Sequence, residues 1–221
     1  MAQAENTGGS WTYIHSGVLN VFEGALSEPS ISGKLETGTV AILHAKVLGG
    51  TLLLYECKAL AVNEGKLKTG GEILGKLSFK ECETLLNGVL SVPCAPKAGG
   101  TQAGVIETNK IKAVMLLHKL DDGTVHKILI ATPDEANNDF AFVESSAACS
   151  IGLKVLIGGK FAIQDPAPLT HSVNHLIKEF APLTHLFVIS DTVEHAAIIL
   201  GSAEAFLSGS HVNYEWAGVW N

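Results

Sequence analysis

The chain has 221 residues, of which 47% are hydrophobic and 17% are charged, so it can fold around a core of its own and is not an intrinsically disordered chain. All 15 basic residues are lysine and the formal net charge is −7, so nucleic acid is not an expected partner. No apolar run approaches the ~18 residues that a bilayer-spanning helix needs, and we expect no membrane span.

Residues 1–35 are expected to form an N-terminal extension to a single β domain that covers residues 36–221. Residues 1–10 are polar and rich in glycine, which is typical of a terminus that needs contacts to become ordered. Exchange of the segment as a strand between subunits would supply such contacts. The same residues lack a basic stretch followed by an apolar run, so they do not resemble a signal peptide.

An alternating pattern over residues 39–48 predicts the first strand of the main domain. Apolar residues occupy every second position, whereas His44 and Lys46 lie on the opposite face. The Gly49-Gly50 step then predicts a two-residue hairpin turn, because glycine tolerates the positive φ that such turns need. The alternation resumes over residues 51–62, so the two segments are expected to pair.

Short apolar runs separated by turn residues continue to the C-terminus and predict an all-β fold, an antiparallel β-sandwich or barrel-like domain with many hairpins. Residues 192–207 would also suit a helix, but Gly201 near their midpoint and the β-branched Ile198 and Ile199 favour a hairpin. The remaining predicted strands are residues 72–81, 111–120, 125–131, 140–144, 151–157, 160–164, 176–180, 185–190, 194–200, 203–208 and 212–216, with turns at 63–65, 70–71, 121–123 and 201–202.

Cys57, Cys82, Cys94 and Cys149 are the four cysteines, and we expect them to form two disulfides. They include no Cys-x-x-Cys pair, so a zinc ribbon is not expected. Four cysteines permit three connectivities. We favour Cys82 with Cys94, which closes a short loop, and Cys57 with Cys149.

His171, His175 and Glu179 come closest to a metal-binding set. On a helix they would share a face and could hold zinc. On a strand, however, His171 and His175 would lie ~13 Å apart at ~3.3 Å per residue, too far for one ion. The acidic turns at residues 121–123 and 134–139 carry the oxygen ligands that calcium prefers, but turn formation already explains them. We therefore expect no metal site.

No catalytic residue and no cofactor are expected. Ser190, Asp191 and His195 lie close together in the sequence, but a polar turn between two strands explains them better than a hydrolase site does. Ser210 lacks the flanking glycines of a nucleophile elbow. The glycine-rich stretches match neither a dinucleotide-binding fingerprint nor a phosphate loop.

Aromatic residues gather near both ends of the chain. If they are exposed on a sheet, Trp11, Tyr214, Trp216 and Trp220 would stack on a glycan or anchor a surface protein. Alternatively, they cap the ends of the core. The two groups could also pair the first strand of the fold with the last.

These observations favour a non-catalytic structural protein that forms a homo-oligomer. We expect self-assembly by β-strand addition into an extracellular fibre, tube or surface layer, because the weakly charged surface offers few devices that block sheet edges. Paired cysteines agree with an extracellular or cell-surface location. The alternatives are a secreted carbohydrate- or protein-binding module, a structural protein of a virus particle, and a hydrolase that uses His195 or His211.

Overall fold

The computed structural model describes residues 4–5, 9–22, 28–98, 102–119, 123, 125–134, 139–152, 154–164, 171–179 and 185–220. The acidic turn residues 121–122 and 135–138 lie outside this set, as do the side chains of Glu179 and Trp220. Within the described ranges, no helix is long and apolar enough to cross a membrane.

Every regular element of these ranges is a β-strand or a short 3₁₀ turn, which confirms the all-β class. In chain order the strands are β1 (Ala4–Glu5), β2 (Gly9–His15), β3 (Val18–Val21), β4 (Ile31–Leu35), β5 (Ala41–Val47), β6 (Thr51–Lys68), β7 (Glu72–Leu86), β8 (Val89–Leu90), β9 (Lys97–Ala98), β10 (Gln102–Ala103), β11 (Val105–Glu107), β12 (Ile111–Lys119), β13 (Val125–Pro133), β14 (Asp139–Glu144), β15 (Lys154–Gln164), β16 (Asn174–Glu179), β17 (His185–Ser190), β18 (Val193–Leu200), β19 (Ser202–Leu207) and β20 (Glu215–Trp220). The 3₁₀ turns are η1 (Leu48–Gly50), η2 (Thr69–Gly71), η3 (Val92–Cys94) and η5 (Gly209–His211).

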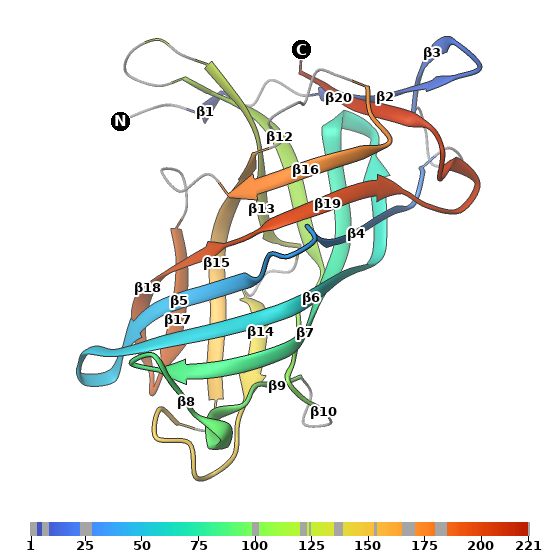
Figure 1. The fold of residues 1–221 in the computed structure, drawn as a ribbon. Coiled ribbons are helices and arrows are strands. Elements are labelled where there is room, and N and C mark those ends of the chain that lie inside the picture. The colour runs from blue at the N-terminus through green and yellow to red at the C-terminus, as the bar shows by residue number, and fades with distance from the viewer. Residues whose placement is uncertain are drawn as a thin grey trace.

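An eight-stranded antiparallel barrel forms the lower half of the molecule in Figure 1, in the order β5, β6, β7, β11, β14, β15, β17, β18. It closes where β18 pairs with β5, with Ala197 opposite Ala45. The junction between β11 and β14 is a single bridge between Thr108 and Ala141. Along β5, buried side chains alternate with more exposed ones, as the sequence pattern predicts.

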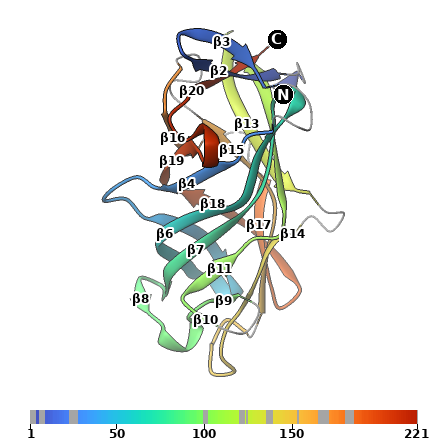
Figure 2. The same ribbon diagram turned by 90° about the vertical axis from the view of Figure 1, so that its right-hand side faces the viewer.

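The long strands β6, β7 and β15 run beyond the barrel into what we call the distal sheet, formed with β4, β12, β13, β16 and β19 (Figures 1 and 2). Residues 63–66 let β6 make this passage. The pairing of β6 with β7 shifts register between Asn63 and Lys66, and Glu64 adopts a φ of 55°. The predicted turn at residues 63–65 is therefore wrong, because the extra residue forms a β-bulge that bends one continuous strand.

A three-stranded sheet of β20, β2 and β3 closes the far end of the molecule, and in it the N-terminal part of the chain meets the C-terminal part. Tyr13 lies opposite Trp216 in the register, which confirms the predicted pairing of the two aromatic groups. β4 pairs with β19 in the distal sheet. The described part of residues 1–35 thus contributes strands to the sheets of its own chain, and exchange of this segment between subunits stays a prediction.

Two glycine positions that we placed between predicted strands have other roles in the structure. The predicted strands 151–157 and 160–164 are joined in β15, which passes through Gly158 and Gly159. A Cβ on Gly159 would lie 1.9 Å from the carbonyl oxygen of His185 on β17, and its φ is +99°. Glycine is needed there for the close approach of two strands, and the predicted division into two strands was wrong.

The second such position is Gly201. Residues 193–200 and 202–207 are strands and not a helix, as we predicted, but they do not pair with each other as a hairpin. β18 pairs with β17 and β5 in the barrel, whereas β19 pairs with β16 and β4 in the distal sheet. Gly201, with a φ of 150°, leads the chain from one set of partners to the other. Further along, the strand predicted at residues 212–216 begins only at Glu215, because η5 and a turn precede it.

Both expected disulfides form, but their pairing differs from the one we favoured. Cys57 is bonded to Cys82, its register partner across β6 and β7, and Cys94 is bonded to Cys149. The favoured pairing was wrong because strand register, and not the short separation of Cys82 and Cys94 in the sequence, decides which side chains meet. The Cys94–Cys149 bond ties η3 to the loop after β14 and closes the lower end of the barrel.

The hydrophobic core has two main parts. The first lies inside the barrel and includes Leu53, Tyr55 and Val188, and the second lies between the distal sheet and the closing sheet and includes Leu67 and Met115. Phe161 packs against both parts. Complete burial of an aliphatic side chain of this size contributes ~1.5–3 kcal/mol, so the two parts together stabilise a rigid, elongated body.

Candidate functional site

The β2–β3 hairpin projects at one end of the molecule and carries a strand with exposed apolar side chains (Figures 1 and 2). Its turn is the Ser16-Gly17 step, whose φ values of 51° and 77° fit a two-residue hairpin turn of the favoured twist. On β3, Val18 is 59%, Leu19 61% and Val21 45% exposed. Apolar side chains thus face solvent on both sides of this strand.

The outer edge of β3 has no partner strand within the described residues, where β2 is its only neighbour. The two-residue turn makes His15 and Val18 a hydrogen-bonded pair, and hydrogen-bonded pairs then recur at every second position. The Phe22 N–H donates to the Trp11 carbonyl at 2.9 Å, in step with this alternation. The N–H and C=O groups of Leu19 and Val21 therefore point outward, where a further strand could bind them.

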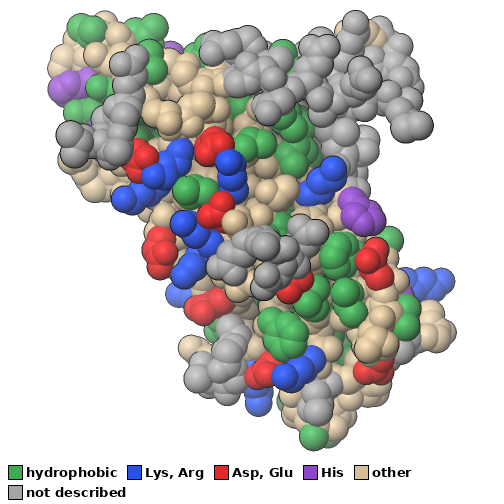
Figure 3. Space-filling view, turned by 180° about the vertical axis from the view of Figure 1, so that it is seen from behind, with side chains coloured by type: hydrophobic (Ala, Val, Ile, Leu, Met, Phe, Trp, Pro, Cys, Tyr) green, Lys and Arg blue, Asp and Glu red, His purple; other side chains and the backbone are tan. Residues whose placement is uncertain are grey.

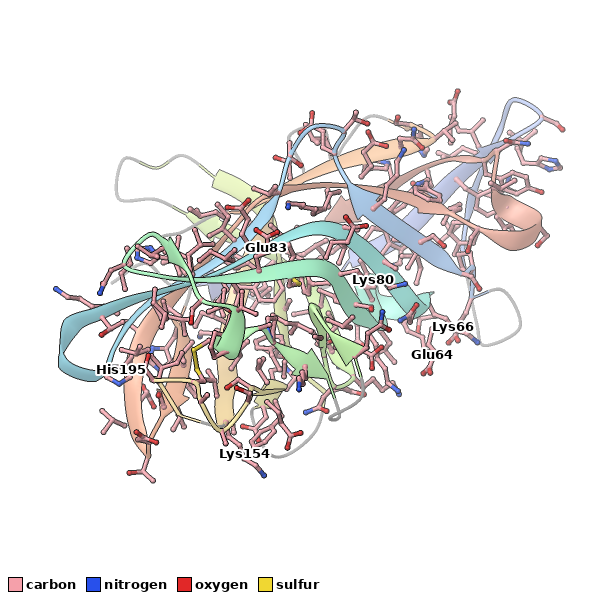
Figure 4. The ribbon with its side chains drawn as sticks, turned by 60° about the horizontal axis from the view of Figure 1, so that its bottom comes forward. Glu64, Lys66, Lys80, Glu83, Lys154 and His195 are labelled. Carbon is pink, nitrogen blue, oxygen red and sulfur yellow. A yellow bond between two sulfur atoms is a disulfide. The ribbon has the colours of Figure 1, made fainter. Side chains whose placement is uncertain are left out.

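Apart from its short length of four residues, β3 has no device that protects this edge. Natural proteins block edge strands with lysine, proline or inward-pointing charges, and residues 18–21 contain none of these. Elsewhere, one face of the molecule has acidic and basic side chains intermixed (Figure 3), with ion pairs such as Lys76–Glu64 and Lys112–Glu72 on β6, β7 and β12. Figure 4 shows Glu64 and Lys66 at the bend of β6, and both are exposed. The uncharged β3 edge differs from this face.

Stacked rings hold the hairpin in place. The Tyr13 ring stacks on Phe22 with centroids 4.2 Å apart and on Tyr214 at 5.4 Å, and His15 stacks on the other end of Tyr214 at 4.5 Å. The Trp11 indole N–H donates to the Glu72 carbonyl at 2.9 Å, which ties β2 to the start of β7. Because these contacts immobilise β2, the β3 edge is presented as a fixed template for another strand.

The terminal aromatics cap the core in the structure. Trp11 is 4% and Trp216 3% exposed, and their ring centroids lie 5.6 Å apart. Tyr214 is half-buried within the ring stack, and the Trp220 side chain is outside the described set. Of the two interpretations of these residues, core capping agrees with the burial of Trp11 and Trp216. Both rings fill the end of the second core, so neither offers a flat face to a glycan.

The two histidines of the predicted metal set contact protein groups. A ring nitrogen of His171 lies 3.0 Å from the Thr12 hydroxyl, and Nε2 of the buried His175 lies 2.6 Å from the Trp216 carbonyl, to which it donates. Among the residues that the structure describes, no group of three or more His, Cys, Asp or Glu side chains is placed to hold a metal ion.

Ser190 and His195, which a hydrolase would use, are engaged in separate environments. The Ser190 hydroxyl is buried and donates to the Ile151 carbonyl at 2.9 Å, so it helps to close the lower end of the barrel. Asp191 occupies the exposed turn between β17 and β18 with a φ of 48°. His195 lies on β18 (Figure 4), and its Nε2 is buried without a hydrogen-bond partner in the described part of the chain. This arrangement agrees with a structural turn.

Sequence reasoning missed β3, which lies inside the segment that we interpreted as an extension. The signal was present. A Ser-Gly step between the apolar residues Ile14 and Val18, with Trp11 and Tyr13 alternating before it, is a short hairpin pattern. No known protein family, no curated protein sequence and no solved structure matches this chain, so the site is interpreted from its own geometry.

Proposed function

We propose that this protein is a non-catalytic structural protein that self-associates by β-strand addition at the outer edge of β3. The observation that carries the proposal is this edge, which is uncharged, apolar and held rigidly by the ring stack. The two disulfides support an extracellular or cell-surface setting, because such bonds persist in oxidising compartments. A virus particle, where strand addition would act in the same way, stays the alternative setting.

Strand addition has a clear physical source at this edge. The outward N–H and C=O groups of Leu19 and Val21 gain protein partners, and each such hydrogen bond contributes roughly 1 kcal/mol net. A second copy that pairs its own β3 antiparallel to the first would create one sheet of six strands around a two-fold axis. The exposed side chains of β3 are buried in the same contact, which adds hydrophobic stabilisation.

A second apolar edge lies at the opposite end of the molecule and would allow a fibre to grow. β8 pairs only with β7 among the described strands, and Val89, Leu90 and Val92 are 69%, 55% and 73% exposed. Figure 1 places β8 at the end of the body away from β3. A β3–β3 contact at one end and a β8–β8 contact at the other would link copies into a linear array. With one contact alone, assembly would stop at dimers.

The test compares the free edge strand β3 with a strand that also has exposed apolar side chains but already has a neighbouring strand on each side. In the Leu19→Lys/Val21→Lys variant, two lysines replace exposed apolar residues of β3. In the control, Val193→Lys/Ile198→Lys, the same change is made on β18, which has strands on both sides. Light scattering after size exclusion, with negative-stain imaging, should show wild type and control as assemblies over a concentration series and the β3 variant as dimers at most.

A Val89→Lys/Leu90→Lys variant should in turn stop at β3-linked dimers. The proposal would be overturned if the wild type showed only compact monomers at every concentration, or if the β3 variant assembled as the control does. Circular dichroism of each variant verifies that the fold is retained.

A further inference from the structure

Two adjoining cavities lie inside the barrel wall, with volumes of ≈ 50 and ≈ 90 Å³. Both are lined by Ala41, Leu77, Phe79, Phe161 and Ile199. Eight strands enclose an interior that is either filled by side chains or left with space for one small ligand. This barrel has part of its interior unfilled.

Tyr55 makes the first cavity unusual, because its phenol is a polar group in an apolar wall. Tyr55 lines the cavity and is 1% exposed, and no hydrogen bond joins its hydroxyl to a described residue. A buried tyrosine hydroxyl normally has a hydrogen-bond partner, since leaving it without one costs ~1–3 kcal/mol. The other hydroxyl in the lining, that of Thr108, already accepts the Leu77 N–H at 2.8 Å.

Burial also decides the protonation state of the Tyr55 hydroxyl. It raises the pKa of Tyr55 above its ordinary value, so the group stays protonated and can donate a hydrogen bond. Among the described residues, no charged side chain lines either cavity, and Cys57, bonded to Cys82, adds only apolar surface. An ionised ligand would lose its hydration without compensation here. The lining therefore suits a neutral molecule with a single hydrogen-bond acceptor.

The second cavity reaches the barrel wall where β18 gives way to β19. Leu200, Gly201 and Ser202 line it there, beneath the segment 36–40 that connects β4 to β5. This segment is held by the Thr39 hydroxyl, which donates to the Glu36 and Ser202 carbonyls at 2.8 and 3.2 Å. Residues 36–40 are therefore fixed against the strands that line the second cavity.

We propose that the barrel binds one small neutral molecule with an apolar skeleton, about the size of a six-membered ring, whose single acceptor oxygen takes the hydrogen bond of Tyr55. This size requires the first cavity, ≈ 50 Å³ beside Tyr55, to join the second, ≈ 90 Å³, when the molecule binds, by movement of the side chains that line both. The joined space would then approach the ~150 Å³ that admits benzene into an engineered protein cavity. Cyclic ketones are the simplest class that meets both requirements. The site is independent of strand addition at β3, so either proposal can fail without the other.

The probes are cyclohexanone and methylcyclohexane, which have the same skeleton size but differ in the acceptor oxygen. Calorimetric titration should show that both bind the wild type, and methyl NMR should place the shifted resonances on Leu77 and Ile199. In Tyr55→Phe, the affinity for cyclohexanone should fall about five- to tenfold, the worth of one hydrogen bond, while that for methylcyclohexane stays unchanged. In Ala203→Leu, which fills the second cavity, both affinities should fall at least tenfold.

Three results would overturn the proposal. One is the absence of binding to the wild type near the solubility limit of both probes. Another is a set of shifted methyl groups that lies outside the cavity lining. The third is an unchanged cyclohexanone affinity in Tyr55→Phe. The first two measurements use the unaltered protein, so they decide the question even if a variant fails to fold.

Discussion

Removal of the Cys94–Cys149 disulfide should lower the free energy of unfolding by about 4 kcal/mol, since the bond restricts the unfolded chain. Its cysteines are separated by 55 residues, and the entropy lost by the unfolded chain grows with the length of the closed loop. The same relation, applied to the separation of 25 between Cys57 and Cys82, predicts about 3.5 kcal/mol. Alanine is the replacement of choice, because Cys94 is buried and a serine hydroxyl would need a partner.

The assay is urea unfolding followed by tryptophan fluorescence, with Cys57→Ala/Cys82→Ala as the matched control. Both double variants should unfold at lower urea concentration with a similar dependence on denaturant. A loss of less than about 1 kcal/mol for Cys94→Ala/Cys149→Ala would refute the reasoning from loop entropy. It would mean that the loops at the lower end of the barrel remain restricted in the unfolded chain without the bond.

The pairing can be checked on the same protein by digestion without reduction. Cleavage after lysine leaves Cys57 in residues 47–58, Cys82 and Cys94 together in residues 81–97, and Cys149 in residues 128–154. The observed pairing joins all three peptides, and further cleavage after Glu83 should leave Cys82 with the Cys57 fragment. A pair of linked peptides, 47–58 with 128–154, and a separate looped 81–97 would instead be the pairing that the sequence favoured.

Three further predictions follow from burial and backbone geometry. Leu53→Ala, inside the barrel, should lower the free energy of unfolding by ~2–5 kcal/mol, whereas Leu90→Ala on the exposed β8 should change it by less than ~0.5 kcal/mol, both measured by urea unfolding. Gly159→Ala should fail to give the native near-ultraviolet circular dichroism spectrum, because the new Cβ would meet the carbonyl oxygen of His185 on β17; native-like spectra would contradict this. The pKa of Tyr55 is raised in the folded state, so the contribution of Tyr55 to the free energy of unfolding is complete below about pH 10 and is lost as the pH rises further. The wild type should therefore lose stability at alkaline pH, and Tyr55→Phe should lose less. Thermal melts across that pH range would measure the difference.

The parts of the fold that could be predicted from sequence are those in which local pattern and final partner agree. Residues 39–62 are the clearest case. Their alternation and the Gly49-Gly50 step predict a hairpin, and β5 pairs with β6, although the connection is the three residues Leu48–Gly50 and not the two-residue turn that we expected. The pairing of β2 with β20 was also one of the alternatives that the aromatic residues at the two ends of the chain offered, and Tyr13 lies opposite Trp216. In these cases the residues that carry the signal contact each other.

The open edge and the unfilled cavity could not be predicted in the same way. The exposure of Leu19 depends on which strand lies beside β3, and the short pattern around Ser16-Gly17 contains no information on the outer neighbour. Tyr55 follows Leu53 by two residues and lies on the same buried face of β6, as is usual for core residues. Only the closed barrel shows that its hydroxyl has no hydrogen-bond partner among the described residues, because that depends on side chains from several other strands.

The composition and local patterns determined that this chain folds as antiparallel strands, with two disulfides and a surface poor in charge, since these properties follow from residue type and from the two-residue repeat of a strand. Tertiary structure alone decided the backbone conformation of Gly159 and Gly201 and the disulfide partner of each cysteine. Gly159 lies within a strand and Gly201 lies between two strands, although other glycines of the chain form turns. The φ of each glycine and the backbone nearest to it are set by residues that are distant in the sequence. Cys57 meets Cys82 for the same reason, since strand register brings side chains together irrespective of their separation along the chain.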